Sequence, residues 1–251
     1  MMLLFQQTDG TTHLHTGDFR ASPHMESYSV FWNNIDVDTL FLDTTYCNEK
    51  YDFPTQEDVL QCVVEQVDKH ASQSNSRVLF LCGSYTIGKE KVFRAVAEHI
   101  GSKIWSKPRK LKILHELRDP KLTSLLTNNS KEAAVHVVPM HDINFQSLQR
   151  YLQSMRFHFS EVVAFRPTGW QYSQRNTLMY SLETRDKVSI YSLPYSEHSS
   201  FLELQRFVKF LKPEKVVVTV KTKGKTWEEI ASVCNTWARI ARGKKPKPSF
   251  H

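Results

Sequence analysis

The sequence contains no long apolar run, no closely spaced cysteine pair and no internal repeat. No stretch approaches the roughly 20 apolar residues that cross a bilayer, so no membrane partner is expected. The apolar start at 1–5 ends at Gln6 and has no basic region before it, unlike a secretory signal peptide. The cysteines form no C-x-x-C motif, which argues against a zinc module and favours free thiols: Cys47, Cys62, Cys82 and Cys234.

The composition is that of a folded and basic protein. Hydrophobic residues make up 40% of the 251 residues, enough for one large core or two smaller ones. The formal net charge of +7 is compatible with a polyanionic partner such as nucleic acid. A generically basic protein explains the same charge equally well.

Apolar periodicity predicts strands that alternate with helices, which is the pattern of an α/β protein. Asp9-Gly10 predicts a hairpin between strands at 3–7 and 11–15, and capping signals start helices at Thr55 and Thr226. The segment 102–130 is basic and predicted to be rich in loops. Further strands are predicted at 39–42, 77–82, 133–138, 161–165, 187–191 and 215–220, and further helices near 92–100, 145–155 and 204–211.

Three polar residues stand where predicted strands end. Asp18 lies on a Gly17 turn, Asp43 follows the strand at 39–42, and His198 lies in a serine-rich loop. Two carboxylates and a histidine at strand ends form the skeleton of a metal-dependent hydrolase site. The alternatives are a turn-capping aspartate, with Arg20 as its counter-charge, and a histidine that merely precedes a helix N-cap.

Two further patterns are weaker. The segment 83–90 nearly matches the phosphate loop G-x-x-x-x-G-K-[ST], but Glu90 replaces the hydroxyl that would bind magnesium. Lys89 near a helix N-terminus can still hold one phosphate of a larger ligand. His13 and His15 point to one face of a strand, where histidines are more often structural than metal-binding.

Five strings together resemble one family. HTGDFRAS (15–22), LFLDTTYC (40–47), CGSYTIGKEKVF (82–93), AFRPTGW (164–170) and PYSEHSSF (194–201) are similar to the DNA cross-link repair nucleases. This group contains Artemis and Apollo and is the DNA-acting branch of the β-CASP metallo-β-lactamases. The resemblance runs from about Leu3 to Val220 and is nearest to the cross-link-repair 5′ exonuclease branch.

The resemblance implies a partial metallo-β-lactamase αββα sandwich with an inserted β-CASP α/β domain. It places residues 1–51 in the first part of the sandwich, 52–186 in the insertion, 187–242 in the return to the sandwich, and 243–251 in a basic tail.

The resemblance also implies roles for single residues. Asp18 matches the acid that bridges two metal ions in the family. Asp43 and His198 match the acid and histidine that lie beside the scissile phosphate. Val220 matches a position that is valine in DNA-acting members and histidine in RNA-cleaving ones. Lys89, Arg166 and Lys110 are weaker candidates for contacts with the DNA backbone.

One departure from the family is large. The family's H-x-H-x-D-H motif and a later metal-binding histidine precede the HTGDFR string, and this sequence contains neither. Zinc or another divalent metal, dinuclear in the intact family, would therefore have an incomplete site here. We expect an N-terminally incomplete chain that is inactive alone.

The function expected of the intact protein is metal-dependent 5′-to-3′ hydrolysis of DNA phosphodiesters in interstrand cross-link repair. Its substrate would be DNA with damaged or 5′-phosphorylated ends, and its location the nucleus, with the basic segment 244–247 in support. Two alternatives remain, a non-catalytic DNA-binding or scaffold protein and an RNA-processing β-CASP nuclease.

Overall fold

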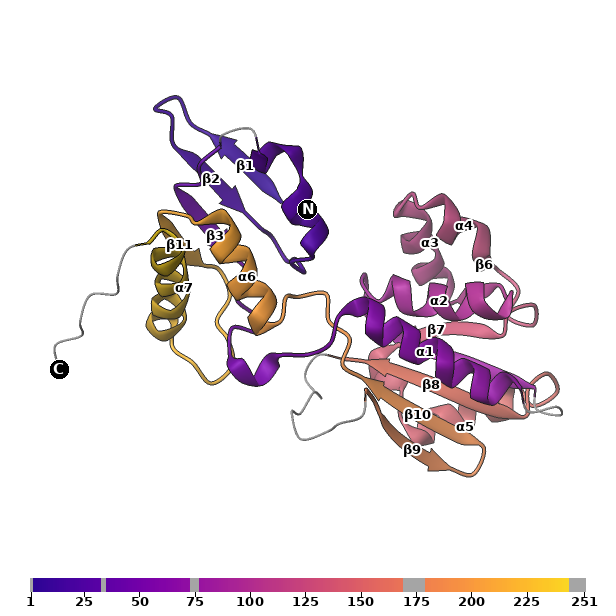
Figure 1. Cartoon of the computed structure of the whole chain (residues 1–251). Coiled ribbons are helices and arrows are strands. Elements are labelled where there is room, and N and C mark those ends of the chain that lie inside the picture. The colour runs from indigo at the N-terminus through magenta and orange to yellow at the C-terminus, as the bar shows by residue number, and fades with distance from the viewer. Residues whose placement is uncertain (1, 33–34, 73–76, 169–178, 244–251) are drawn as a thin grey trace. The chain divides into compact units, whose positions relative to one another are not determined.

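The computed structural model describes residues 2–32, 35–72, 77–168 and 179–243, which divide into two compact units (Figure 1). Unit 1 comprises Met1–Asp52 and Ser196–His251, and unit 2 comprises Phe53–Tyr195. The first boundary lies close to the predicted one. The second lies after Tyr195 rather than after the predicted Asp186, because β10 (Val188–Leu193) pairs with two strands of unit 2.

Unit 1 contains a four-stranded sheet of order β1-β2-β3-β11. The predicted hairpin is confirmed, since the first two strands pair antiparallel around Asp9-Gly10, where Gly10 adopts the left-handed φ of +89°. β3 is parallel to both of its neighbours. The strands are β1 (Leu3–Gln6), β2 (Thr12–His15), β3 (Thr39–Leu42) and β11 (Lys215–Val218).

Two helices supply the core of unit 1. α6 (Phe201–Leu211) and α7 (Trp227–Ala241) both begin with capping boxes, as predicted for Thr226. Their apolar faces share one buried cluster with the sheet, which includes Leu14, Leu40, Leu42, Phe207, Ile230 and Trp237. The short 3-10 helices of this unit are η1 (Pro23–Ser27), η2 (Ser29–Trp32) and η3 (Glu49–Tyr51).

Unit 2 is built on a seven-stranded sheet of order β6-β5-β7-β4-β8-β10-β9. Its strands pair in parallel, except that β9 runs antiparallel to β10. The strands other than β10 are β4 (Val78–Ser84), β5 (Ile104–Ser106), β6 (Leu126–Thr127), β7 (Val135–Pro139), β8 (Glu161–Pro167) and β9 (Ser181–Arg185).

Helices cover both faces of this sheet. Side chains alternate along a strand, so Phe80 of β4 joins a cluster with α1 and α2, while Leu79 and Leu81 join a cluster with α5. The helices are α1 (Gln56–Ala71), α2 (Glu90–Ile100) and α5 (Phe145–Ser154), with the 3-10 turn η4 (Met140–Asp142). The cap predicted at Thr55 is present, and Gly101 ends α2 in the left-handed conformation.

The prediction of loops over 102–130 is wrong. This segment contains two strands and two helices, α3 (Pro108–Glu116) and α4 (Pro120–Leu125). Each helix begins with a proline, whose fixed φ suits a first turn. The lysines that suggested a loop lie among leucines that pack inward, namely Leu111, Leu114 and Leu122.

None of the helices in the described ranges is both long and apolar enough to cross a bilayer. The four cysteines are buried free thiols, as predicted. Cys47 and Cys234 lie in contact, with their sulfurs 3.8 Å apart.

Candidate functional site

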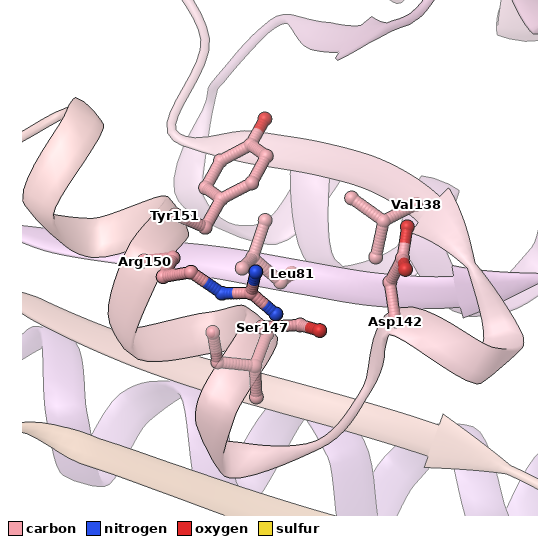
Figure 2. A pocket seen from close by; sticks show the side chains of 7 residues that line it. Leu81, Val138, Asp142, Ser147, Arg150 and Tyr151 are labelled. Carbon is pink, nitrogen blue, oxygen red and sulfur yellow. The ribbon is translucent and has the colours of Figure 1, made fainter.

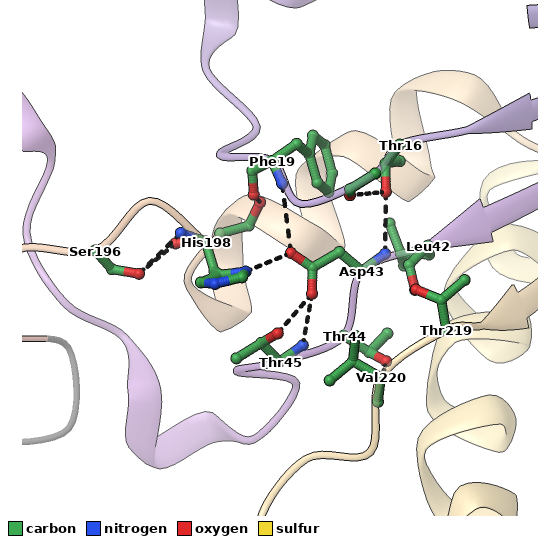
Figure 3. A network of polar contacts seen from close by, with 12 residues as sticks. Thr16, Phe19, Leu42, Asp43, Thr44, Thr45, Ser196, His198, Thr219 and Val220 are labelled. Carbon is green, nitrogen blue, oxygen red and sulfur yellow. Dashed lines mark hydrogen bonds and ion pairs between the residues drawn. The ribbon is translucent and has the colours of Figure 1, made fainter. Parts of the chain in front are cut away.

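Asp43 lies at the centre of a polar network in unit 1 (Figure 3). It follows β3 and is only 2% exposed. One carboxylate oxygen accepts hydrogen bonds from the backbone N (3.0 Å) and hydroxyl (2.6 Å) of Thr45. The other accepts from Nδ1 of His198 at 2.7 Å and from the backbone N of Phe19 at 3.4 Å. The structure therefore brings the two predicted catalytic residues together from 155 positions apart in the chain.

The charge of Asp43 fixes the chemistry of His198. Burial alone would raise the pKa of Asp43, but the hydrogen bonds from His198 and Thr45 outweigh it and hold that pKa below its ordinary value. A carboxylate accepts only, so Nδ1 of His198 carries the hydrogen of this bond. The neutral ring then has its lone pair on Nε2, which is the form that accepts a proton or contacts a phosphate hydroxyl.

Asp18 completes the cluster from the loop after β2. Gly17 takes a φ of +58°, the left-handed turn that the sequence suggested, and the Asp18 side chain beyond it is exposed. Asp18, Asp43 and His198 each offer a ligand atom, and these atoms lie within 4.8 Å of one another.

The loops around the cluster are tied together by hydrogen bonds. Ser199 donates its hydroxyl and backbone N to the carbonyl of Phe19, each at 3.0 Å, and accepts from the backbone N of Ala21 at 2.9 Å. On the other side, Thr16 accepts from the backbone N of Asp43 at 3.0 Å. Sequence analysis did not select these hydroxyl residues, because serines and threonines in loops are common.

Arg20 does not serve as the counter-charge of Asp18. Its guanidinium binds both carboxylate oxygens of Glu203, at 3.1 and 3.2 Å, and the carbonyl of Ser196 at 3.2 Å. Glu203 also closes the capping box with Ser200 at the start of α6. The Arg20–Glu203 ion pair therefore fixes the loop that precedes His198. The three-residue spacing of Ser200 and Glu203 is the sequence pattern of a capping box.

The cluster fits only part of the divalent metal site that the resemblance implies. Asp43 already accepts four hydrogen bonds, which suits a fixed carboxylate better than a metal ligand. Asp18 and Nε2 of His198 are two donors, whereas a catalytic zinc site has three protein ligands. Within the described ranges, Asp18 is thus the residue that best fits a ligand role.

Val220, the predicted specificity position, lies beside this network. Its carbonyl accepts the hydroxyl of Thr44, the residue after Asp43, and the Thr44 carbonyl accepts the hydroxyl of Thr222. These bonds fix the segment after β11 to the loop that carries Asp43.

The three predicted DNA contacts all lie in unit 2. Lys89 is 6% exposed and donates to the carbonyl of Tyr195 at 3.1 Å. Arg166 donates to the carbonyl of Ile143 at 2.8 Å. The rest of its string, from Gly169 onward, lies outside the described residues.

Lys110 closes the loop at 84–88. Its ammonium donates to the carbonyls of Tyr85 (3.0 Å) and Thr86 (2.9 Å) and to the Ser84 hydroxyl (3.1 Å). A phosphate loop instead presents backbone N–H groups to its ligand. The loop therefore lacks the geometry of a phosphate loop, in agreement with the presence of Glu90 in place of the magnesium-binding hydroxyl.

His13 and His15 stack against Phe41 on the sheet of unit 1. Nδ1 of His15 accepts the backbone N–H of Gly17 at 3.0 Å, a structural contact. Neither histidine belongs to the ligand cluster found among the described residues.

Unit 2 also has a pocket of 380 Å³ between β4, β7 and α5 (Figure 2). Leu81, Val138 and Leu148 line it together with Asp142, Ser147, Arg150 and Tyr151. None of the residues selected from the sequence lines this pocket.

Comparison with known proteins gives a consistent picture. Residues 120–224 match the family model described as DNA repair metallo-beta-lactamase. The chain is 46% identical over 221 residues to DNA cross-link repair 1A protein from Mus musculus, covering 87% of this chain and 21% of that protein. It is 40% identical to DNA cross-link repair protein SNM1 from Arabidopsis thaliana, covering 95% of this chain and 50% of that one.

A more distant relative is the 5′ exonuclease Apollo from Rattus norvegicus, 28% identical over 88% of this chain and 36% of its own. The chain thus spans half or less of the length of these relatives. The mixed α/β architecture agrees with the family, and the family implies a divalent metal. Residues 120–224 thus match the DNA repair metallo-beta-lactamase family, and over most of its length the chain is similar to the cross-link repair proteins of the β-CASP metallo-β-lactamases.

Proposed function

We propose that this chain forms part of a DNA repair nuclease that hydrolyses DNA from the 5′ end during interstrand cross-link repair. The observation that carries the proposal is the 2.7 Å hydrogen bond between buried Asp43 and His198, next to the exposed carboxylate of Asp18. The relatives named above, which are DNA cross-link repair proteins and a 5′ exonuclease, support the choice of reaction.

In this proposal the three residues have separate tasks. Asp43 orients the His198 ring by accepting its Nδ1–H, and the carboxylate charge stabilises the ring when Nε2 is also protonated. His198 then contacts the scissile phosphate or transfers a proton at the leaving oxygen. Asp18 is a ligand for a divalent metal, zinc by preference, which when bound supplies Lewis-acid activation and charge stabilisation.

The substrate we propose is DNA with damaged or 5′-phosphorylated ends, in the nucleus. Valine at position 220 supports DNA over RNA, because it is the residue that the resemblance associates with DNA-acting members. The charge of +7 supports a polyanionic substrate.

The described donor set further suggests that this chain alone holds metal weakly and cleaves poorly. One carboxylate and one imidazole give fewer ligands than a catalytic site needs. Elemental analysis of the purified chain measures this directly. Stoichiometric zinc that survives dialysis against a weak chelator would contradict it.

A nuclease assay tests the whole proposal. The assay uses the tagged full-length protein that contains this chain, purified from its own cells, instead of the isolated chain. It is incubated with single-stranded DNA that carries a 5′ phosphate. We expect shortening from the 5′ end in the wild type and in His141→Ala, a control whose side chain is 83% exposed. Asp18→Asn and His198→Ala should abolish it.

Three outcomes count against the proposal. Equal cleavage of matched RNA favours an RNA-processing enzyme. DNA binding without cleavage in the wild type favours a scaffold role. Undiminished cleavage by His198→Ala removes the proposed site from the reaction.

A further inference from the structure

The carboxyl edge of the unit 2 sheet carries an exposed aromatic ring close to exposed cations. β4 and β5 both run parallel to β7, which lies between them, so their carboxyl ends meet at one edge. Tyr85 directly follows β4, and Lys107 directly follows β5. The crevice outside the carboxyl ends of strands is where open α/β sheets bind their ligands.

The loop that carries Tyr85 is fixed from within. Its carbonyls face the ammonium of Lys110, as described above, and the Ser84 hydroxyl donates to the Gly88 carbonyl at 3.0 Å. The side chains point the other way, since Tyr85 is 56% and Ile87 is 64% exposed. A ring held on an ordered loop loses little conformational freedom when it binds a ligand.

Two of the cations beside this loop, Lys107 and Arg109, have no acidic partner among the described residues. Lys110 lies in the first turn of α3 and brings the start of that helix against the loop. Lys107 and Arg109, on either side of Pro108, are exposed, and in the described ranges no ion pair or hydrogen bond of their side chains is found. Glu90 is paired with Lys110 at 3.6 Å.

We propose that this edge binds single-stranded DNA, with an unpaired base stacked on the Tyr85 ring and the flanking phosphates on Lys107 and Arg109. An aromatic platform beside a basic track is the combination that binds single strands without sequence preference. A duplex hides the faces of its bases, so the ring favours a single strand. The inference rests on the proposed function for its choice of DNA.

The same sheet offers matched controls at its other edge. Phe157 precedes β8 and is 74% exposed, and Lys187 precedes β10 and is exposed. Both strands run in the same direction as β4, so these residues lie at the amino edge. They have the same chemistry as Tyr85 and Lys107 but not the same location.

Binding is measured by fluorescence anisotropy of the purified chain with a 5′-phosphorylated 12-nucleotide single strand labelled at its 3′ end. Tyr85→Ala should weaken binding about tenfold, the effect of losing one stacked base, while Tyr85→Phe should bind as the wild type does. Lys107→Ala with Arg109→Ala should lower the slope of log affinity against log salt by about 1.4, for two lost phosphate contacts. Phe157→Ala and Lys187→Ala should leave both quantities unchanged.

The inference is overturned if the wild-type chain does not bind the strand, if Tyr85→Ala binds normally, or if the amino-edge variants lose as much affinity. It is also overturned if Tyr85→Ala reduces binding of a blunt duplex equally, since no base is then being stacked. Unchanged melting temperatures exclude misfolding as the cause. The nuclease assay with His198→Ala is independent, because a binding failure at Tyr85 leaves that result standing, and a failed nuclease assay leaves the binding result standing.

Discussion

The two units use charged side chains at strand ends in opposite ways. In unit 1, Asp43 is buried after β3, and its charge is directed at His198 and the loop around it. In unit 2, Lys89 and Lys110 also follow or flank strand ends, but their ammonium groups are bound by backbone carbonyls. Lys110 also lies 3.6 Å from Glu90. The comparison teaches that a charged residue at a strand end can either orient another titratable side chain or hold the backbone of a loop, and that the geometry of its partners distinguishes the two.

Asp43→Asn gives the largest expected effect. The amide keeps the shape but loses the charge that orients His198, so cleavage by the tagged protein should fall 10²- to 10⁴-fold, the range for general acid–base groups. Glu203→Gln is the control, because it also replaces a carboxylate of unit 1 by an amide but does not touch the His198 ring. It should lower the cleavage rate much less. Single-turnover rates on 5′-phosphorylated DNA measure both, and equal losses would show that Asp43 acts only through loop structure.

Phe93→Ala tests the core of unit 2. Phe93 is fully buried between α2 and the sheet, so its removal should cost about 3–5 kcal/mol of unfolding free energy. Urea unfolding followed by circular dichroism measures the loss. The same experiment on Phe207→Ala should destabilise unit 1 by a similar amount, and two separate transitions would show that the units unfold independently.

Lys110→Ala should lower the free energy of unfolding by about 1–3 kcal/mol, because the carbonyls of Tyr85 and Thr86 lose a charged hydrogen-bond donor. Burial lowers the pKa of Lys110, and Glu90 opposes that shift. Lys112→Ala removes an exposed cation from the same helix and should change stability little. Equal costs in thermal melts would mean that the contacts of Lys110 with the loop contribute nothing.

The smallest effect concerns pH. Burial lowers the pKa of His136 from its ordinary 6.5, and its ring is hydrogen-bonded to Tyr151 and to the Ser130 carbonyl. The unfolded chain then binds more protons than the folded chain below about pH 6.5, so stability should fall as pH falls from there.

The expected loss is about 1 kcal/mol for each pH unit within that window. Urea midpoints at pH 8.0 and 5.5 measure it. His136→Phe, tested in parallel, should have a flatter profile. A steep profile that persists in this variant would assign the effect to other groups.

Local rules predicted much of the secondary structure. Periodicity and capping residues placed the hairpin at Asp9-Gly10, the strand 39–42 and the helix starts at Thr55 and Thr226, because these depend on neighbours in sequence. They failed over 102–130, where short elements leave too few residues for a period to show. The boundary that the resemblance implied after Asp186 also differs from the end of the compact unit at Tyr195, since β10 pairs with β8 and β9 of unit 2.

The sequence by itself determined the family, through five strings, and which residue types stand at the strand ends. Only the tertiary structure decided which of them meet. Asp43 and His198 are adjacent because Ser199 and Arg20 hold distant loops together. Lys89 and Lys110 instead donate hydrogen bonds to backbone carbonyls. The physical reason is that a hydrogen bond requires its two atoms within about 3 Å, a condition that depends on the packing of remote segments and that no local pattern encodes.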